Sequence, residues 1–266
     1  MVSPTTGRAA SDASGAVFKS SDGGASWVPA NSGLNHTAVL TLAIDPKNPR
    51  TLYAGTVPGG IFKSVDGAAT WTRINFTAAS TDIAAVVVDP VNSGTVYTVA
   101  RNDITRLACA PIPSPIQGTD SGIYKTMDGG TTWIAVNWGG PPGGKVNAIA
   151  IDPSYSGNVY AGLSGGVFKS TNGGANWTPV SSGLTNNNIR ALAVDPAKPT
   201  TIYAGTSGGV FKSIDSGANW SVENNGLPGV RLNCTATPAA PTGVSVFCRT
   251  WQAGLTFASR ARAKTQ

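Results

Sequence analysis

The sequence predicts an all-β protein built from repeated small antiparallel sheets, and three observations support this prediction. An eleven-residue phrase of the type V-F-K-S-x-D-G-G-x-x-W, here called the Asp-turn motif, occurs five times in the 266 residues. Its closing tryptophans are 44, 62, 44 and 43 residues apart, which is the spacing of a sheet-sized repeat. The chain has 33 Gly, 18 Pro and only 12% charged residues, a composition typical of short strands joined by tight turns. The motifs are Val17–Trp27, Ile61–Trp71, Ile123–Trp133, Val167–Trp177 and Val210–Trp220.

A second block recurs between the motifs and supplies two further strands. Each copy has an apolar run that ends at Asp-Pro, a turn, and a β-branched and aromatic run. Together with the motif this makes four antiparallel strands, A to D, and such sheets repeated radially form a β-propeller with short, protected edges. In the last copy we expect strands A to D at 191–195, 201–205, 209–213 and 219–222; the blocks begin at Leu42, Val86, Ile149 and Leu192.

The two ends of the chain complement each other. The amino-terminal part supplies only strands C and D, and the carboxyl-terminal part supplies only degenerate strands A, B and C. We therefore expect five blades, four complete and one composite of both termini, or six or more if the chain is a fragment. The amino-terminal strands are Val17–Ser20 and Ser26–Pro29, and the carboxyl-terminal ones begin at Val230, Val244 and Gly254.

The predicted domain organisation follows from this closure. Residues 1–14 are expected to be a flexible segment, and residues 15–258 a single propeller with an insertion at 101–120. Residues 259–266 are expected to be a basic, flexible tail.

The repeated acids are interpreted as structural. An Asp that accepts backbone N–H groups across a tight turn explains one acid in each motif, and the Trp five residues later packs over that turn. A catalytic or metal-binding role would not require near-identical copies in every sheet. The same reasoning covers the Asp that precedes Pro at each strand A end, and the repeated Lys of each motif is expected to be solvated. The motif residues are Asp22, Trp27, Asp66, Trp71, Asp128, Trp133, Asn172, Trp177, Asp215 and Trp220.

The phrase S-x-D-G-G-x-x-W resembles the Asp-box, or bacterial neuraminidase repeat. Combined with DP…YAGT…GGVFKS, it is similar to the repeats of xyloglucanase-like, sortilin-type and photosystem II assembly-factor propellers over residues 15 to about 222. This resemblance implies a propeller fold and says little about function. The sialidase branch implies an Arg-Ile-Pro segment before the first motif, whereas this chain has SDASGAVFKS there.

Few candidates for catalysis remain outside the repeat. Glycoside hydrolysis requires two carboxylates about 5–9.5 Å apart. The xyloglucanase resemblance implies two catalytic Asp outside the motifs, and the weak candidates are Asp82, Asp103 and Asp120. His36 is the single histidine and has no cluster of Cys or His around it in the sequence, so we expect neither a metal site nor a cofactor.

Departures from the repeat indicate a binding face. If strand A is innermost, the loops between strands D and A and between B and C lie on one face, here called the loop face. The A–B turns and the Asp-turn motifs lie on the opposite face. The insertion, two non-repeat tryptophans and the run Asn186–Asn188 all fall on the loop face. Aromatic, amide and charged side chains there suit a sugar or a peptide. The candidate ligand-binding residues are Trp138, Trp251, Arg101, Asp103 and Arg106.

The sequence therefore favours a non-catalytic binding or scaffold module that presents its loop face to a protein or polysaccharide partner. Two alternatives remain open. One is a glycoside hydrolase of the xyloglucanase-like or sialidase-like type, or a degenerate remnant. The other is an assembly factor with a basic docking patch of Arg101, Arg106, Arg190 and Arg231. The net charge is +6, but the 19 Lys and Arg are scattered, so no nucleic-acid partner is expected.

Cys234 and Cys248 flank the turn-rich stretch TPAAPTG and would face each other if the flanking segments form a hairpin. They form either a disulfide, which would imply an oxidising compartment, or two small buried residues. Cys109 would be left unpaired. No apolar run approaches the roughly 18 residues of a membrane span. We expect an extracellular or periplasmic protein whose signal is not visible in this chain, with a cytoplasmic location as the alternative.

Overall fold

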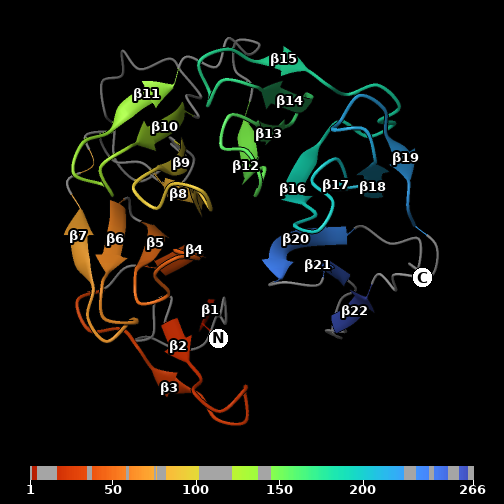
Figure 1. Cartoon of the computed structure of the whole chain (residues 1–266). Coiled ribbons are helices and arrows are strands. Elements are labelled where there is room, and N and C mark those ends of the chain that lie inside the picture. The colour runs from red at the N-terminus through yellow and green to blue at the C-terminus, as the bar shows by residue number, and fades with distance from the viewer. Residues whose placement is uncertain are drawn as a thin grey trace, which may run out of the picture. The chain divides into compact units, whose positions relative to one another are not determined.

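The computed structural model describes the strands and most of the turns of the repeat. The described residues are 2–4, 17–34, 38–57, 60–74, 76, 82–101, 122–136, 145–224, 232–239, 243–250 and 258–262. Within these ranges every regular element is a β-strand, and the strands form six antiparallel sheets (Figure 1). The chain divides into two compact units, Met1–Val136 and Asn137–Gln266, and each unit holds three of the sheets.

The first unit contains one three-stranded and two four-stranded sheets. Each four-stranded sheet is made of strands consecutive in sequence, so its connections are local. The first sheet is β1 (Val2–Pro4), β2 (Val17–Lys19) and β3 (Val28–Pro29); the second is β4 (Ala38–Ile44), β5 (Leu52–Val57), β6 (Gly60–Ser64) and β7 (Thr72–Ile74); the third is β8 (Asp82–Val88), β9 (Val96–Arg101), β10 (Gly122–Thr126) and β11 (Ile134–Val136).

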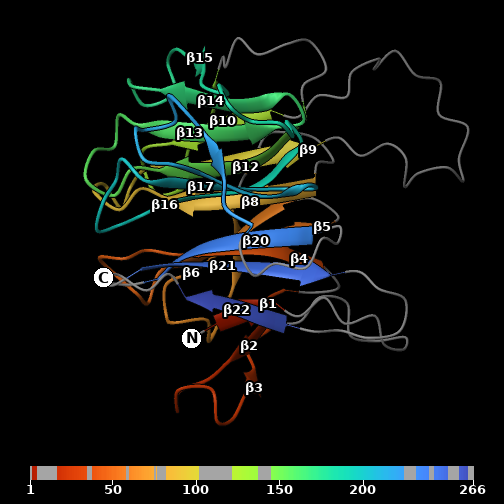
Figure 2. The same cartoon turned by 90° about the vertical axis from the view of Figure 1, so that its right-hand side faces the viewer.

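The second unit contains two four-stranded sheets and one three-stranded sheet. Figure 2 shows strands β12, β13 and β14 of this unit side by side. The sheets are β12 (Val146–Ile151), β13 (Val159–Leu163), β14 (Gly166–Ser170) and β15 (Thr178–Pro179); β16 (Ile189–Val194), β17 (Ile202–Thr206), β18 (Gly209–Ser213) and β19 (Ser221–Val222); and β20 (Leu232–Ala239), β21 (Gly243–Thr250) and β22 (Ala258–Arg262).

The four complete sheets confirm the predicted order of strands A to D. In the sheet β16–β19, for example, each strand pairs antiparallel with the next, within two residues of the predicted bounds. Within each unit the first strands of successive sheets contact each other, β4 with β8 and β12 with β16. Strand A of each sheet therefore packs beside strand A of the next sheet, as the innermost strands of propeller blades do.

The terminal sheets differ from the prediction. A composite blade would pair strands from both ends of the chain, but β2 pairs with β1 and β3, while β21 pairs with β20 and β22. The physical reason is local. Residues 2–4 satisfy the free backbone edge of β2, and residues 258–262 satisfy that of β21, so each edge takes a nearby strand.

Each Asp-turn motif is a turn closed by a carboxylate or amide. In the fifth motif, Asp215 Oδ1 accepts the backbone N–H of Asn219 (2.9 Å) and the hydroxyl of Ser213 (2.7 Å). The same Ser213 hydroxyl accepts the backbone N–H of Gly217 (2.8 Å). Equivalent bonds occur in the other motifs, and Asn172 makes them with its neutral amide oxygen. The bond from the Asn219 backbone, followed by those from the Asn219 and Ser213 side chains, lowers the pKa of Asp215 to about 2.

The motif tryptophan joins one sheet to the sheet before it. Trp71 is buried, and its Nε1 donates to the carbonyl of Ala30 (2.9 Å), while its backbone N–H donates to Ser32 (2.8 Å). Trp220 makes the same two bonds, to Val180 (2.7 Å) and Ser182 (2.8 Å). The segment after the last strand of one sheet therefore supplies two carbonyl groups that bind the tryptophan of the next sheet. We call this segment the seat of that tryptophan.

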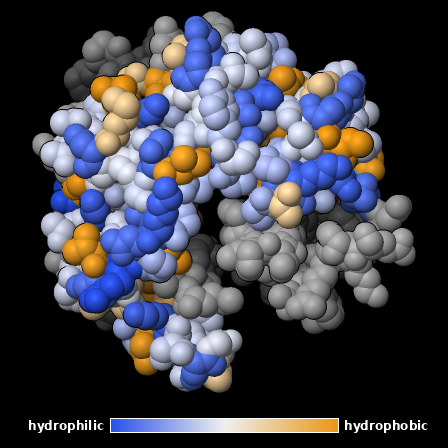
Figure 3. Space-filling view, in the orientation of Figure 1, coloured by the Kyte–Doolittle hydropathy of each residue, from blue (hydrophilic) through white to orange (hydrophobic). Residues whose placement is uncertain are grey.

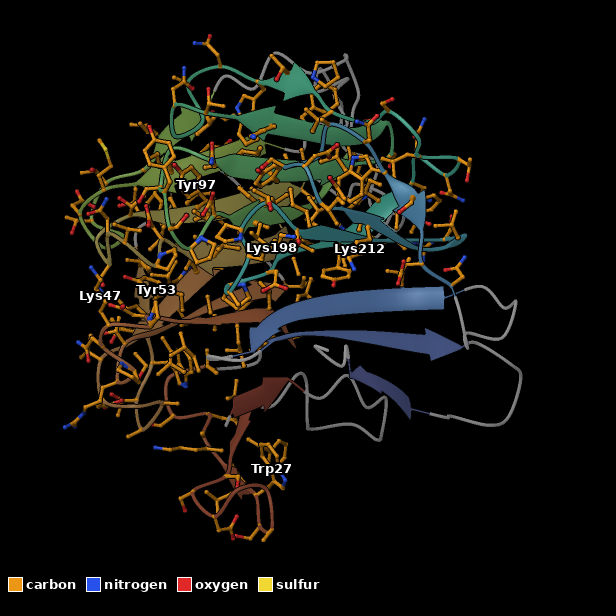
Figure 4. The ribbon with its side chains drawn as sticks, turned by 45° about the vertical axis from the view of Figure 1, so that its right-hand side comes forward. Trp27, Lys47, Tyr53, Tyr97, Lys198 and Lys212 are labelled. Atoms are coloured by element: carbon orange, nitrogen blue, oxygen red, sulfur yellow. The ribbon has the colours of Figure 1, made fainter. Side chains whose placement is uncertain are left out.

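The other motif tryptophans are not described as donating their indole N–H to a neighbouring sheet. The Nε1 groups of Trp133 and Trp177 donate within their own turns, to Gly130 (3.2 Å) and Gly174 (3.0 Å). Trp27, labelled in Figure 4, lies in the first motif and is 39% exposed. The expectation that each Trp packs over its own turn thus describes only part of its role.

The repeated lysines are not simply solvated, which corrects the expectation from sequence. Lys19 Nζ donates to the carbonyl of Gly67 (2.9 Å), and Lys63 Nζ donates to that of Gly129 (2.8 Å). Both acceptors lie in the Asp-turn motif of the following sheet. Lys63 also lies over the ring of Tyr53, 5.4 Å from its centroid, and burial raises the pKa of that phenol to about 12. The other pairs of this kind are Lys125–Tyr97, Lys169–Tyr160 and Lys212–Tyr203.

Replacing Gly183 with Ala should destabilise the second unit. Gly183 has a φ of +88°, and an added Cβ would lie 2.2 Å from the carbonyl oxygen of Trp220. We expect a loss of about 1–3 kcal/mol in the free energy of unfolding, measured by urea denaturation. Gly165→Ala is the matched control, because an added Cβ there meets no atom within 4 Å. Equal stabilities for the two variants would contradict this account of the seat.

Replacing Asp215 with Asn should make the protein less sensitive to acid. The folded pKa of Asp215, about 2, lies below its ordinary value of 3.8. Its contribution is therefore fully present above about pH 4 and is lost as the pH falls through 2. Urea denaturation from pH 5 to pH 2 should show a smaller loss of stability for D215N than for the wild type. The converse variant, Asn172→Asp, should show a larger loss, and superimposable pH profiles would count against the assignment.

Candidate functional site

The face that carries the Asp-turn motifs holds acids that are engaged in turns. Asp45 Oδ1 accepts the backbone N–H of Lys47 (2.9 Å) and the hydroxyl of Ser93 (2.8 Å). Asp152 and Asp195 likewise accept backbone N–H groups two residues ahead. Asp89 accepts the backbone N–H of Val91 in the same way. These four carboxylates hold the turns between strands A and B, and with the four motif Asp they account for eight of the described carboxylates.

Strand A of each complete sheet carries a β-bulge near its start. The register shifts by one residue between Val39 and Thr41, and shifts recur at the equivalent place in the other three sheets. A bulge leaves one residue outside the ladder and changes the direction of its side chain. This end of strand A adjoins the loop face. The bulged residues are Leu40, Ala84, Asn147 and Arg190.

The bulged position is more variable than its neighbours in strand A. The following positions are apolar or small in all four sheets, whereas the bulged position holds Leu, Ala, Asn or Arg. A position freed from ladder pairing can change without disturbing the core. We therefore regard the bulges as the places where a repeated scaffold can acquire specificity.

In the second unit two bulges form a polar pair. The side-chain amide of Asn147 donates to the carbonyl of Ile189 (2.8 Å), the residue just before Arg190. Asn147 is half-buried, whereas Arg190 is exposed. Lys145, also exposed, precedes β12 at the same end, and its carbonyl accepts the backbone N–H of Ser164 (3.2 Å). Two cations and an amide therefore gather at the loop face of this unit.

The predicted Asn run lies beside these residues on the connection from β15 to β16. Asn186 Oδ1 accepts the backbone N–H of Asn188 (3.1 Å) and the hydroxyl of Ser207 (3.3 Å). Ser207 belongs to the turn between β17 and β18, so the amide ties two loops of the face together. Asn187 is exposed. This end of the second unit thus presents amides, hydroxyls and cations in a partly fixed arrangement.

In the first unit the register brings together two residues singled out from the sequence. Asp82 begins β8 and is the cross-strand partner of Arg101, which ends β9. Opposite charges at such positions stabilise each other. Both residues are half-buried and make further interactions. Asp82 therefore lies opposite a cation. The sequence singled out Asp82 only as a weak catalytic candidate and did not predict this pairing.

Several predicted residues lie outside the described residues. They include four of the five candidate ligand-binding residues, so the structure places only Arg101 of that set. Sequence reasoning, in turn, did not single out Lys145 or Asn147, because a bulge has no fixed sequence signature. Of the residues singled out from the sequence, those outside the described ranges include Asp103, Arg106, Asp120, Trp138, Trp251, Arg231 and His36.

The described residues contain no obvious reaction centre. Beyond the repeat, their carboxylates are Asp82 and Glu223, which belong to different units, so neither unit shows a non-repeat pair. No group of three or more His, Cys, Asp or Glu suited to a metal occurs in the described part of the chain. The same residues include no helix that could cross a membrane. On the face drawn in Figure 3, hydrophobic residues are scattered in small groups among hydrophilic ones.

Comparison with known proteins supports the fold. No family model matches the chain, and no curated protein is significantly similar to it. Among solved structures, an ancestral GH74 enzyme has a TM-score of 0.65 and 21% identity; the match covers 92% of this chain and 35% of that one. YCF48 bound to D1 peptide has a TM-score of 0.51 and 15% identity, covering 88% and 83% of the two chains. YCF48 from Cyanidioschyzon merolae has a TM-score of 0.53 and 14% identity, covering 80% and 64%.

The chain thus spans about a third of the length of the GH74 enzyme that it matches. Identities at this level concern the fold and leave activity open. Together with the four sheets of consecutive antiparallel strands, they show that this chain is an all-β protein with the blades of a β-propeller.

Proposed function

We propose that this chain is a non-catalytic β-propeller module that binds an acidic segment of a protein partner on the loop face of its second unit. The observation that carries the proposal is the exposed Arg190 on a bulge, next to the residue that binds Asn147, with the exposed Lys145 two residues before Asn147. Its motifs are assigned to the Asp-box type, and their role is to build the scaffold.

The chemistry of this face suits a peptide with carboxylates. A guanidinium binds a carboxylate through two parallel hydrogen bonds, and an ammonium adds a second positive charge. The exposed side chain of Asn187 can donate to and accept from a peptide backbone. These groups are presented from strand starts and short loops of a rigid sheet, which reduces the entropy lost on binding.

The comparisons are compatible with this proposal. YCF48, solved with a D1 peptide, matches over most of both chains, whereas the GH74 match covers about a third of the enzyme. Peptide binding is therefore known for a propeller of similar extent.

A glycoside hydrolase is the second candidate, and the GH74 likeness is the observation that favours it. It requires a carboxylate pair across a substrate, and the candidates are Asp82, Asp103 and Asp120. If the chain binds a polysaccharide but does not hydrolyse it, the module is still non-catalytic, and its partner is a polysaccharide instead of a protein.

Arg190→Glu should weaken binding to acidic peptides at least tenfold, because it replaces an attraction with a repulsion. The measurement is fluorescence anisotropy with labelled poly-Glu and mixed Asp/Glu peptides, at low and at physiological salt. Affinity of the wild type should fall as salt rises, since the contacts are exposed charges. Lys198→Glu is the matched control. It makes the same change of charge at the turn between β16 and β17, whereas Arg190 lies at the other end of β16.

Three outcomes would reject the proposal. The first is equal loss of affinity in the Arg190 and Lys198 variants, which would indicate a general charge effect. The second is release of sugar from xyloglucan or sialosides by the wild type, abolished by Asp103→Ala, which would identify a hydrolase. The third is retention on a glycan array without hydrolysis and with no peptide binding, which would identify a polysaccharide as the partner.

A further inference from the structure

We infer that Cys234 and Cys248 form a disulfide that cross-links β20 to β21 in the last sheet. The antiparallel register makes these two residues direct cross-strand partners. Opposite residues in such a ladder have Cα atoms about 4.5 or 5.5 Å apart, and both separations lie within the range that a disulfide spans. The register therefore places the two cysteines within the reach of a disulfide.

The alignment of this ladder is uninterrupted. Pairing runs through eight consecutive positions, from Leu232 with Thr250 to Ala239 with Gly243, without a shift of register. Each of the four other ladders between strands A and B contains a bulge near its start. A one-residue slip would place the two cysteines on opposite faces, so the continuous ladder is what keeps them together.

The repeat shows what the same position does in the other sheets. Pro238 near the end of β20 aligns with Pro196, which follows β16. Counting back four residues from each Pro, Cys234 corresponds to Leu192, and Cys248 corresponds to its partner Ala204. The equivalent pairs are Leu42–Ala54, Val86–Thr98 and Ile149–Ala161. In all four pairs the second residue is fully buried.

This register position therefore joins a large and a small side chain in the core between sheets. Two cysteines can replace such a pair simply as apolar filling, since Cys is often buried. The disulfide interpretation explains more, because both members of the pair changed to the same residue and only that combination can form a covalent bond. It also places the bond in the one described sheet of the second unit that has three strands.

The chemistry is an ordinary thiol oxidation. The two thiols lose two protons and two electrons as the S–S bond forms, and a small disulfide such as oxidised glutathione accepts them and leaves as two thiols. The bond would restrict the unfolded chain by closing the segment between residues 234 and 248. It would also accord with the expected extracellular or periplasmic location.

The test uses the full chain carrying Cys109→Ser, equilibrated with oxidised glutathione. We expect no alkylation by iodoacetamide under denaturing conditions until a reductant is added, and a non-reduced digest that links the peptides containing Cys234 and Cys248. Reduction should lower the melting temperature by about 5 °C or more. Free thiols in the oxidised protein, or mixed glutathione adducts at each cysteine, would overturn the inference.

A matched variant separates the bond from simple core filling. Cys234→Leu with Cys248→Ala restores the pair found at Leu192 and Ala204, so it should fold and its melting temperature should not respond to reductant. A reductant effect of equal size in this variant would show that the response does not come from the cysteine pair. The outcome is independent of the proposed function, because peptide binding is tested through Arg190 in a different sheet.

Discussion

The hydrogen-bonded turn of the Asp-turn motif is the interaction on which the rest of this structure depends. Its carboxylate or amide oxygen closes the connection between strands C and D of one sheet. The same turn supplies the carbonyl that receives a lysine from the preceding sheet, as Gly129 does for Lys63. In two motifs its tryptophan then occupies the seat left by that preceding sheet. One short motif thus forms the sheet and stacks it on its neighbour.

This arrangement separates construction from recognition. The acids at the motif end are occupied by backbone N–H groups, and burial raises the pKa of the Tyr53 and Tyr97 phenols there to about 12. The other end of the sheets carries bulges, where side chains leave the ladder. Variation there costs little stability, and this is why Arg190 and Asn147 differ from Leu40 and Ala84 while the adjoining core positions stay apolar or small.

Much of the fold, and less of the candidate site, could be predicted from the sequence. The four complete sheets were predictable because polar turns and apolar runs alternate at a constant spacing. The Asn186–Asn188 run was predictable as a loop-face element for the same reason. The bulges were not, because a bulge depends on how two strands align. Nor was the pairing of β1 with β2, since residues 2–4 carry no repeat signal and pair only because an edge is available.

The sequence by itself determined the class of structure, the number of complete sheets and the structural role of the repeated acids, because these follow from local hydrogen bonding and periodicity. The tertiary structure decided which side chains meet. It placed Asp82 opposite Arg101, joined Asn147 to the strand that carries Arg190, and aligned Cys234 with Cys248. These contacts depend on register and on the stacking of sheets, which residues distant in the chain establish together.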